Sequence, residues 1–217
     1  MYDRANGSGE VQMKIVKTRT EDIATTQMKT INQYMLYDIP NERIAELILL
    51  EGDVKKHSTN LKCDMTDYNF YTKHEELKNV TNIISNTINQ EDQFNYIMSE
   101  CWGAVYRKSH TAIPHDHYPY VKSFIYYVQS PEGSSPLIFD ESHQWNMEKE
   151  KTQTYSIKPK TGLLVVFPSE CKHSVPPSDI DDERIALAGN LFYVPNEALK
   201  NELWTERLLK CNKPWEN

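Results

Sequence analysis

The spacing of apolar residues along the chain changes near residue 100. Before that point apolar positions recur every three or four residues, which is the period of an amphipathic helix. Segment 40–52 has apolar residues at positions 44, 47, 48 and 50 and ends on Gly52, a residue type that commonly ends helices. A second segment at about 73–99 repeats this spacing. The pattern therefore predicts helices in the N-terminal half.

After residue 100, β-branched and aromatic residues come in short runs separated by turns rich in proline, glycine and serine. The predicted strands are 102–106, 121–128, 136–139, 154–157, 162–167 and 184–194. Many short strands without helices between them are typical of a sandwich or jelly roll. We therefore expect a mainly β fold, with the N-terminal helices packed on it.

The length of 217 residues is enough for one sizeable core, so we expect a single domain. Residues 1–20 are polar, which predicts a flexible N-terminus. The remaining 21–217 divide into a helical N-terminal part over 21–100, a jelly-roll core over 101–195 and a C-terminal helix over 196–217.

Composition narrows the possible partners and location. The 24 basic and 31 acidic residues give a net charge of -7 without a basic patch, so nucleic acid is not an expected partner. Apolar runs stay well below the roughly 18 residues of a membrane span, and the first residues do not have the pattern of a secretory signal. Four cysteines are widely scattered, which favours reduced thiols and a cytoplasmic location: Cys63, Cys101, Cys171 and Cys211.

Three histidines form the strongest candidate for chemistry. His115 and His117 are two residues apart, a spacing that on a strand places both side chains on one face and turns Asp116 the other way. His173 follows a Phe-Pro turn 56 residues after His117, and we expect a second, distant strand to supply it. Three protein ligands would leave positions free for water or substrate, as in open iron or zinc sites.

These residues carry a family resemblance. His115-x-His117, segment 123–128, segment 162–168, His173 and Arg184 together resemble the jelly-roll core of the iron(II)- and 2-oxoglutarate-dependent oxygenases. The resemblance covers about the last half of the chain and is closest to the prolyl-4-hydroxylase-like branch. Within that branch it is closest to a group, partly phage-encoded, that has His-x-His-x-Pro where most members have His-x-Asp. A double-stranded β-helix is implied, and a host cytoplasm if the chain is phage-encoded.

The resemblance also implies the cofactors Fe(II) and 2-oxoglutarate (2OG) and their sites. His115, His117 and His173 stand at the positions of the metal ligands. Arg184, eleven residues after His173, stands where the family has the cation that holds the far carboxylate of 2OG. A guanidinium suits this role because it can donate two parallel hydrogen bonds to a carboxylate. Tyr106 and Ser123 stand where the branch has hydroxyl groups that contact the same carboxylate.

The second ligand departs from the common family pattern. Most members use a carboxylate there, whereas three neutral imidazoles contribute no negative charge to the metal. Asp116 could supply the carboxylate in place of His117 if the strand bends at the metal. Both ligand sets therefore remain open at the level of sequence.

The implied function is hydroxylation of an organic substrate, coupled to O2 use and decarboxylation of 2OG to succinate. A peptidyl or prolyl side chain is the substrate expected by analogy, and loop 140–153 with Trp145 is expected to help select it. One alternative is a cupin-like three-histidine dioxygenase without cosubstrate, although Ser109, Val121 and Lys122 depart from the cupin pattern. Another is a non-catalytic jelly-roll binding module, which would not require Arg184.

Overall fold

The computed structural model describes residues 15–23, 29–51, 55–56, 60–92, 94–140 and 154–195. The predicted C-terminal helix over 196–217 and the loop residue Trp145 lie outside these ranges. The elements in chain order are β1 (Ile15–Ile23), β2 (Lys29–Leu36), α1 (Asn41–Glu51), β3 (Lys55–Lys56), β4 (Leu61–Lys62), β5 (Asp64–Met65), the 3-10 turn η1 (Phe70–Thr72), α2 (Glu75–Asp92), β6 (Tyr96–Tyr106), β7 (Thr111–His115), β8 (Lys122–Gln129), β9 (Leu137–Asp140), β10 (Thr154–Ile157), β11 (Leu163–Pro168), β12 (His173–Val175) and β13 (Arg184–Tyr193).

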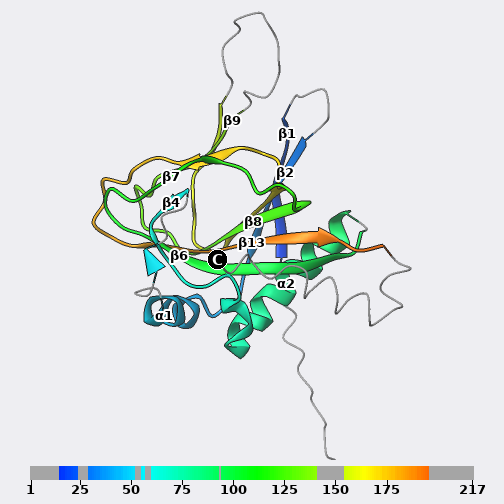
Figure 1. Cartoon of the computed structure of the whole chain (residues 1–217), viewed down its shortest axis with the longest axis horizontal. Coiled ribbons are helices and arrows are strands. Elements are labelled where there is room, and N and C mark those ends of the chain that lie inside the picture. Colours follow the sequence, from blue (N-terminus) through cyan, green and yellow to red (C-terminus); the bar gives the residue numbers. More distant parts are fainter. Residues whose placement is uncertain are drawn as a thin grey trace, which may run out of the picture.

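The strands form two sheets. One sheet has eight strands in the order β1-β2-β11-β8-β13-β6-β5-β3, and the other has five in the order β10-β9-β12-β7-β4. All pairings within both sheets are antiparallel. Figure 1 shows β4, β7 and β9 on one side of the fold and β6, β8 and β13 on the other. This arrangement confirms the predicted mainly β jelly roll of the double-stranded β-helix type.

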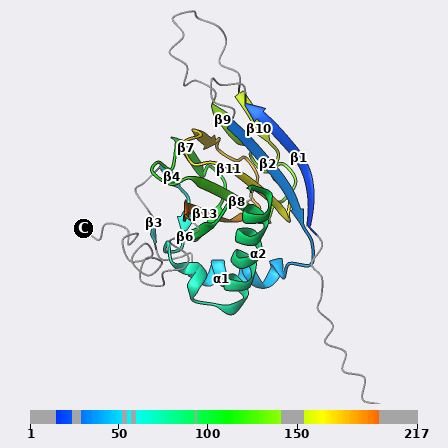
Figure 2. The same cartoon turned by 90° about the vertical axis from the view of Figure 1, so that its right-hand side faces the viewer.

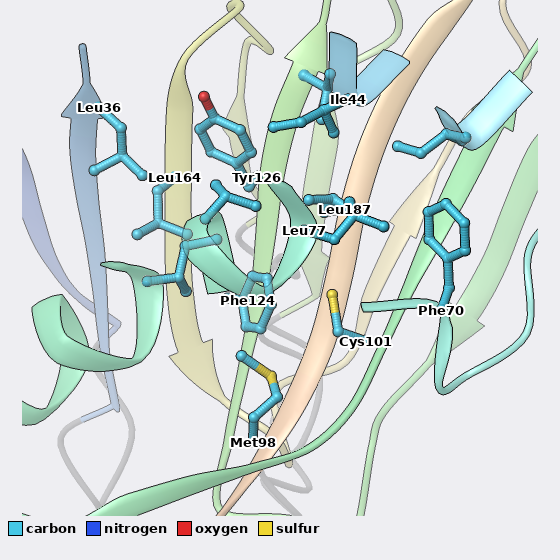
Figure 3. Close-up of a cluster of buried hydrophobic side chains, with 14 of the residues drawn as sticks. Leu36, Ile44, Phe70, Leu77, Met98, Cys101, Phe124, Tyr126, Leu164 and Leu187 are labelled. Atoms are coloured by element: carbon cyan, nitrogen blue, oxygen red, sulfur yellow. The ribbon is translucent and has the colours of Figure 1, made fainter. Parts of the chain in front are cut away.

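Strand β8 separates two apolar clusters because its side chains alternate between the two faces of the sheet. Phe124, Tyr126 and Val128 point toward the helices and join one buried cluster. Tyr127 joins a second cluster between the sheets, with the partly buried Ile125 packed against it. Figure 3 shows the first cluster, in which Phe124 and Tyr126 lie near Leu164 and Leu187 of the neighbouring strands. The second cluster surrounds the site described below.

Helices α1 and α2 lie against the outer face of the eight-stranded sheet (Figure 2). Helix α1 buries Ile44, Leu47 and Ile48 as predicted from the sequence, whereas Leu50, the fourth predicted apolar position, is 75% exposed. Its approach to β6 requires a glycine, because a Cβ built on Gly103 would lie 2.7 Å from the nearest atom of the Ile48 side chain. The predicted helix is therefore confirmed over 41–51, with three of its four predicted apolar positions buried.

The N-terminal half differs from the predicted helical part in two places. Strands β1 and β2 precede α1, and β1 begins at Ile15, inside the segment 1–20 that was predicted to be flexible. The second helix ends at Asp92 rather than near residue 99, because residues 96–99 already belong to β6. Residues 96–98 pair with 191–193 of β13, and these ladder hydrogen bonds override the helical spacing of the apolar residues.

Two further expectations concern cysteines and membranes. Cys63, Cys101 and Cys171 are buried and form no disulfide within the described part of the chain. In the same part, none of the helices has the length and apolar character that crossing a bilayer would require.

Candidate metal and cosubstrate site

The two sheet strands β7 and β12 bring His115 and His173 together. His115 is the last residue of β7 and His173 is the first residue of β12, and the two residues are directly opposite in the antiparallel pairing. Cross-strand pairs of this kind place side chains within about 5 Å of each other. His117 lies two residues beyond β7, where its backbone N–H donates to the carbonyl of Ser169 at 2.7 Å. The described segments thus bring all three predicted histidines to one place.

One ring nitrogen from each of the three histidines lies within 4.8 Å of the others. The ring centroids are 4.4 Å apart for His115 and His173, 5.0 Å for His117 and His173, and 5.1 Å for His115 and His117. Iron or zinc bonds to imidazole are about 2 Å long, so one ion could contact all three rings after small side-chain adjustments. The geometry fits a facial set of three nitrogen ligands.

Backbone carbonyls fix the orientation of two of the rings. The Nδ1–H of His115 donates to the carbonyl of Ile113 at 2.7 Å, and the Nδ1–H of His173 donates to the carbonyl of Cys171 at 2.9 Å. Because a carbonyl only accepts, the proton is on Nδ1 and the lone pair on Nε2 is free for a metal. Such outer hydrogen bonds are typical of histidines that bind metals.

The three imidazoles are neutral at neutral pH. Burial lowers the pKa of His115 and brings the pKa of His117 to about 3, with the charge of His115 as a second cause for His117. Burial also holds the pKa of His173 well below its ordinary value. Neutral imidazoles with free lone pairs are the form that metals bind.

Asp116 takes no part in the cluster among the described residues. Its Oδ1 accepts a hydrogen bond from the backbone N–H of Tyr118 at 3.2 Å, which closes a local turn. One carboxylate oxygen of Asp116 is therefore engaged in this turn, and Asp116 lies outside the group of three nitrogen ligands.

Arg184 is a buried cation with unused hydrogen-bonding capacity. Its side chain is 5% exposed, and one Nη donates to the carbonyl of Ser135 at 2.8 Å. Its Nε has no hydrogen-bond partner among the described residues. The adjacent carboxylate of Glu183 is 2.8 Å from Arg107 instead. A buried guanidinium without a carboxylate is costly, which indicates that an anion completes this site.

A cavity joins the three histidines to Arg184. Its space, counted out into the solvent at its mouth, is about 510 Å³, and its wall is mostly apolar. The indole Nε1–H of Trp102, on the same wall, also has no hydrogen-bond partner among the described residues. Two buried donors without partners on one cavity suit a ligand rich in acceptor oxygens. A dicarboxylate such as 2OG, between a metal on the histidines and the guanidinium, fits this arrangement.

The other two predicted contacts of the cosubstrate differ in position. Tyr106 lines the cavity beside Arg184, and its hydroxyl forms a hydrogen bond with the thiol of Cys63. Ser123 is not among the residues that line the cavity, because its hydroxyl contacts Ser169 and Asn190, at 2.7 Å each. Another residue of β8, Tyr127, lies closer to this role: the centre of its ring is 5.9 Å from the guanidinium carbon of Arg184. The position of Tyr127 therefore suits the role that the resemblance gave to Ser123.

A buried polar network behind His117 was not predicted from the sequence. Asn190 Nδ2 donates to the Glu100 carboxylate at 2.6 Å and lies 3.5 Å from Nδ1 of His117. Asn190 Oδ1 accepts from the Ser123 hydroxyl. The signal in the sequence is a single acidic residue, Glu100, within the otherwise largely apolar stretch 96–106.

The comparisons with known proteins agree with this site. Residues 100–190 match the model of a family described as "Putative 2OG-Fe(II) oxygenase", and this range includes all three histidines and Arg184. No curated protein is similar enough in sequence to count as a match.

Solved structures show the same fold at low sequence identity. A prolyl-4-hydroxylase from Pseudomonas putida is 17% identical with a TM-score of 0.57, over 76% of this chain and 93% of that one. The viral collagen prolyl hydroxylase of Paramecium Bursaria Chlorella virus-1, in complex with 2OG, is 16% identical with a TM-score of 0.55, over 74% and 94%. The carbocyclase SnoK from nogalamycin biosynthesis is 12% identical with a TM-score of 0.59, over 74% and 78%.

The family match and the fold confirm the resemblance seen in the sequence. Residues 100–190 match the family of 2OG-Fe(II) oxygenases, and the fold of the chain is that of the prolyl-4-hydroxylase structures. The matched family is one of enzymes that use Fe(II) and 2OG, and the three histidines are a group that could hold the metal ion.

Proposed function

We propose that His115, His117 and His173 hold Fe(II) and that Arg184 holds the far carboxylate of 2OG. The observation that carries the proposal is the single cavity that has the three imidazoles and the buried, carboxylate-free guanidinium on its wall. Bound iron supplies the activation of O2. The proposed reaction converts substrate C–H, 2OG and O2 into C–OH, succinate and CO2, with one oxygen atom in each of the first two products.

The residues of the chain would orient the cosubstrate and keep water away from it. The Tyr106 ring holds the guanidinium of Arg184 from one side, so that its donors keep a fixed direction. Apolar side chains such as Ala186, Ala188 and Val175 line the cavity between the two polar ends. A dry wall strengthens each ionic contact within the site and limits side reactions with water.

Hydroxylation is the proposed outcome, and a peptidyl or prolyl side chain is the substrate expected by analogy. Two of the similar structures are prolyl hydroxylases, and a third, from Trichoplax adhaerens, is a prolyl hydroxylase in complex with a peptide of an oxygen degradation domain. That third structure is 14% identical with a TM-score of 0.50, so it supports the fold and only suggests the substrate.

The two alternative functions predict different behaviour toward 2OG. A cupin-like dioxygenase would use O2 without a cosubstrate, and a non-catalytic module would use neither. The test measures succinate formation from 2OG and O2 uptake by the purified protein, with and without added Fe(II), with a chelator, and with and without O2. Succinate that depends on both iron and O2 supports the proposal, whereas iron-dependent O2 uptake without succinate would favour the cupin-like alternative.

A further inference from the structure

A second cavity meets the first at the histidines. Its space, counted out into the solvent at its mouth, is about 390 Å³. It shares Leu61, Trp102, His115 and His117 with the cavity that holds Arg184. Its remaining wall consists of Asn60, Tyr68, Glu100 and Asp116. A metal on the three histidines would therefore have the proposed cosubstrate on one side and this second cavity on the other. The second cavity is the place from which an organic substrate would reach the metal.

Glu100 is a buried carboxylate on this second cavity. Its side chain is 8% exposed. Its hydrogen bonds come from neutral groups, the amide of Asn190 at 2.6 Å and the hydroxyl of Tyr120. Burial raises the pKa of its carboxyl, so the ionised form is costly while the cavity holds no cation. A positively charged ligand would remove that cost.

The two cavities differ in the charge of their walls. Arg184 is the charged side chain of the first cavity, whereas the second has two carboxylates, Glu100 and Asp116, and neither Lys nor Arg among its described residues. Tyr68 and Trp102 meet edge to face on the wall of the second cavity, with ring centroids 5.2 Å apart. Aromatic faces attract cations as well as apolar groups.

We infer that the organic substrate carries a cationic amine or guanidinium group, such as a lysyl or arginyl side chain, and that Glu100 binds this group in the second cavity. This inference rests on the proposed function, because it assigns the substrate class of the same site. The cavity accommodates a side chain rather than a folded partner. The charge would hold the substrate so that a neighbouring C–H bond faces the metal. A neutral peptidyl proline, the substrate expected by analogy, would leave the carboxylate without a cation.

The test compares matched peptides on the full chain loaded with Fe(II) and 2OG without O2. Short peptides of identical sequence carry lysine, arginine, norleucine, citrulline or proline at the centre, and calorimetry measures the dissociation constant of each. We expect the lysine or arginine peptide to bind at least about tenfold more tightly than its neutral counterpart, since a desolvated charge pair commonly gives this much or more. The lysine and arginine peptides distinguish an ammonium from a guanidinium ligand.

Two glutamate variants separate this site from general surface charge. Glu100→Gln keeps the shape of the side chain and an acceptor for Asn190 but removes the charge, so the preference for the cationic peptide should disappear. Glu132→Gln removes an exposed carboxylate that lines neither cavity and should keep the full preference. An unchanged preference in Glu100→Gln would overturn the assignment of this residue.

The same samples distinguish failure of the inference from failure of the proposed function. Equal affinity for charged and neutral peptides, tightest binding of the proline peptide, or no peptide binding by protein that does bind 2OG would overturn the inference alone. Absence of iron-dependent 2OG binding by the unmodified protein would overturn the proposed function as well. The peptide series needs no variant, so it remains decisive even if Glu100→Gln does not fold.

Discussion

The guanidinium carbon of Arg184 lies 4.0 Å from the centre of the Tyr106 ring, and both side chains are buried on the wall of one cavity. The two residues are also directly opposite each other in the pairing of β13 with β6. The ring restricts the orientation of the guanidinium before any ligand binds. The arginine side chain therefore loses less conformational entropy on binding. The backbone pairing therefore prepares Arg184 for its proposed role in binding an anion.

Replacement of this guanidinium should weaken cosubstrate binding selectively. We expect Arg184→Ala to raise the 2OG concentration needed for half-maximal succinate formation by at least about 30-fold, because losing a buried charged partner costs roughly 2–5 kcal/mol. Metal content should stay near that of the parent. Arg43→Ala, which removes an exposed arginine on α1, is the control. Equal 2OG affinity in Arg184→Ala and the parent protein would rule out the assigned role.

Alanine variants can show whether His117 or Asp116 is the second metal ligand. We expect His117→Ala to abolish tight Fe(II) binding, whereas Asp116→Ala should retain most of it because Asp116 lies outside the group of three ring nitrogens and its Oδ1 accepts from the Tyr118 N–H. Loss of a group outside the ligand set typically weakens metal binding by only about 10- to 100-fold. Metal analysis after dialysis measures both variants. The reverse order would make Asp116 the ligand.

A substitution that restores the common family pattern gives an independent check. His117→Asp places a carboxylate where most members of the family have one, so this variant should keep iron. Metal analysis and a circular dichroism spectrum of the same sample are sufficient. A folded His117→Asp protein without iron would show that position 117 does not face the metal.

The stability of the metal-free protein should depend on pH through Glu100. Burial raises its pKa in the folded state above the ordinary value of 4.5, so the folded state holds this proton more tightly than the unfolded state. Its contribution to stability is full below about pH 4.5 and is lost as pH rises through the raised pKa. Relative to Glu100→Gln, the free energy of unfolding of the parent protein should therefore fall across that window. Urea denaturation at several pH values measures the free energy of unfolding of both proteins. The prediction would be contradicted if the value for the parent protein minus the value for Glu100→Gln rose with pH.

Asn190 should stabilise the fold through its buried hydrogen bonds. Asn190→Ala removes one buried hydrogen bond from the Glu100 carboxylate and one from the Ser123 hydroxyl, which should lower the free energy of unfolding by about 1–3 kcal/mol. Asn82→Ala, at an exposed position of α2, should be neutral or slightly stabilising because alanine favours helices. Denaturant unfolding of both variants checks the prediction. Equal stability of the two variants would show that the network does not contribute.

The sequence predicted the local features of the jelly-roll half because each has a local physical cause. Gly162 adopts a positive φ of 86° in the turn before β11, as expected for a glycine that separates strands. Strand β10, over 154–157, was predicted at its exact bounds. The three histidines could be selected because their spacing and their turn context are visible without a structure.

The features that the sequence did not reveal depend on distant partners. Strands β1 and β2 have polar and mixed residues, and β2 is a strand because 32–35 pair with 163–166 of β11. Glu100 gave no motif, and its importance follows from burial beside Asn190 and from the cavity that it lines. Ser123 stood at the expected position along the chain, yet its hydroxyl is engaged by Ser169. Such relationships arise from packing, which residue spacing alone does not determine.

The central claim is that one cavity holds iron on three histidines and 2OG on Arg184. A crystal structure of the protein with Fe(II) and 2OG, grown without O2, tests it most directly. The account predicts one metal ion about 2 Å from a nitrogen of each of His115, His117 and His173, and the far carboxylate of 2OG on the guanidinium of Arg184. Metal bound through Asp116 in place of His117, or 2OG without contact to Arg184, would contradict it.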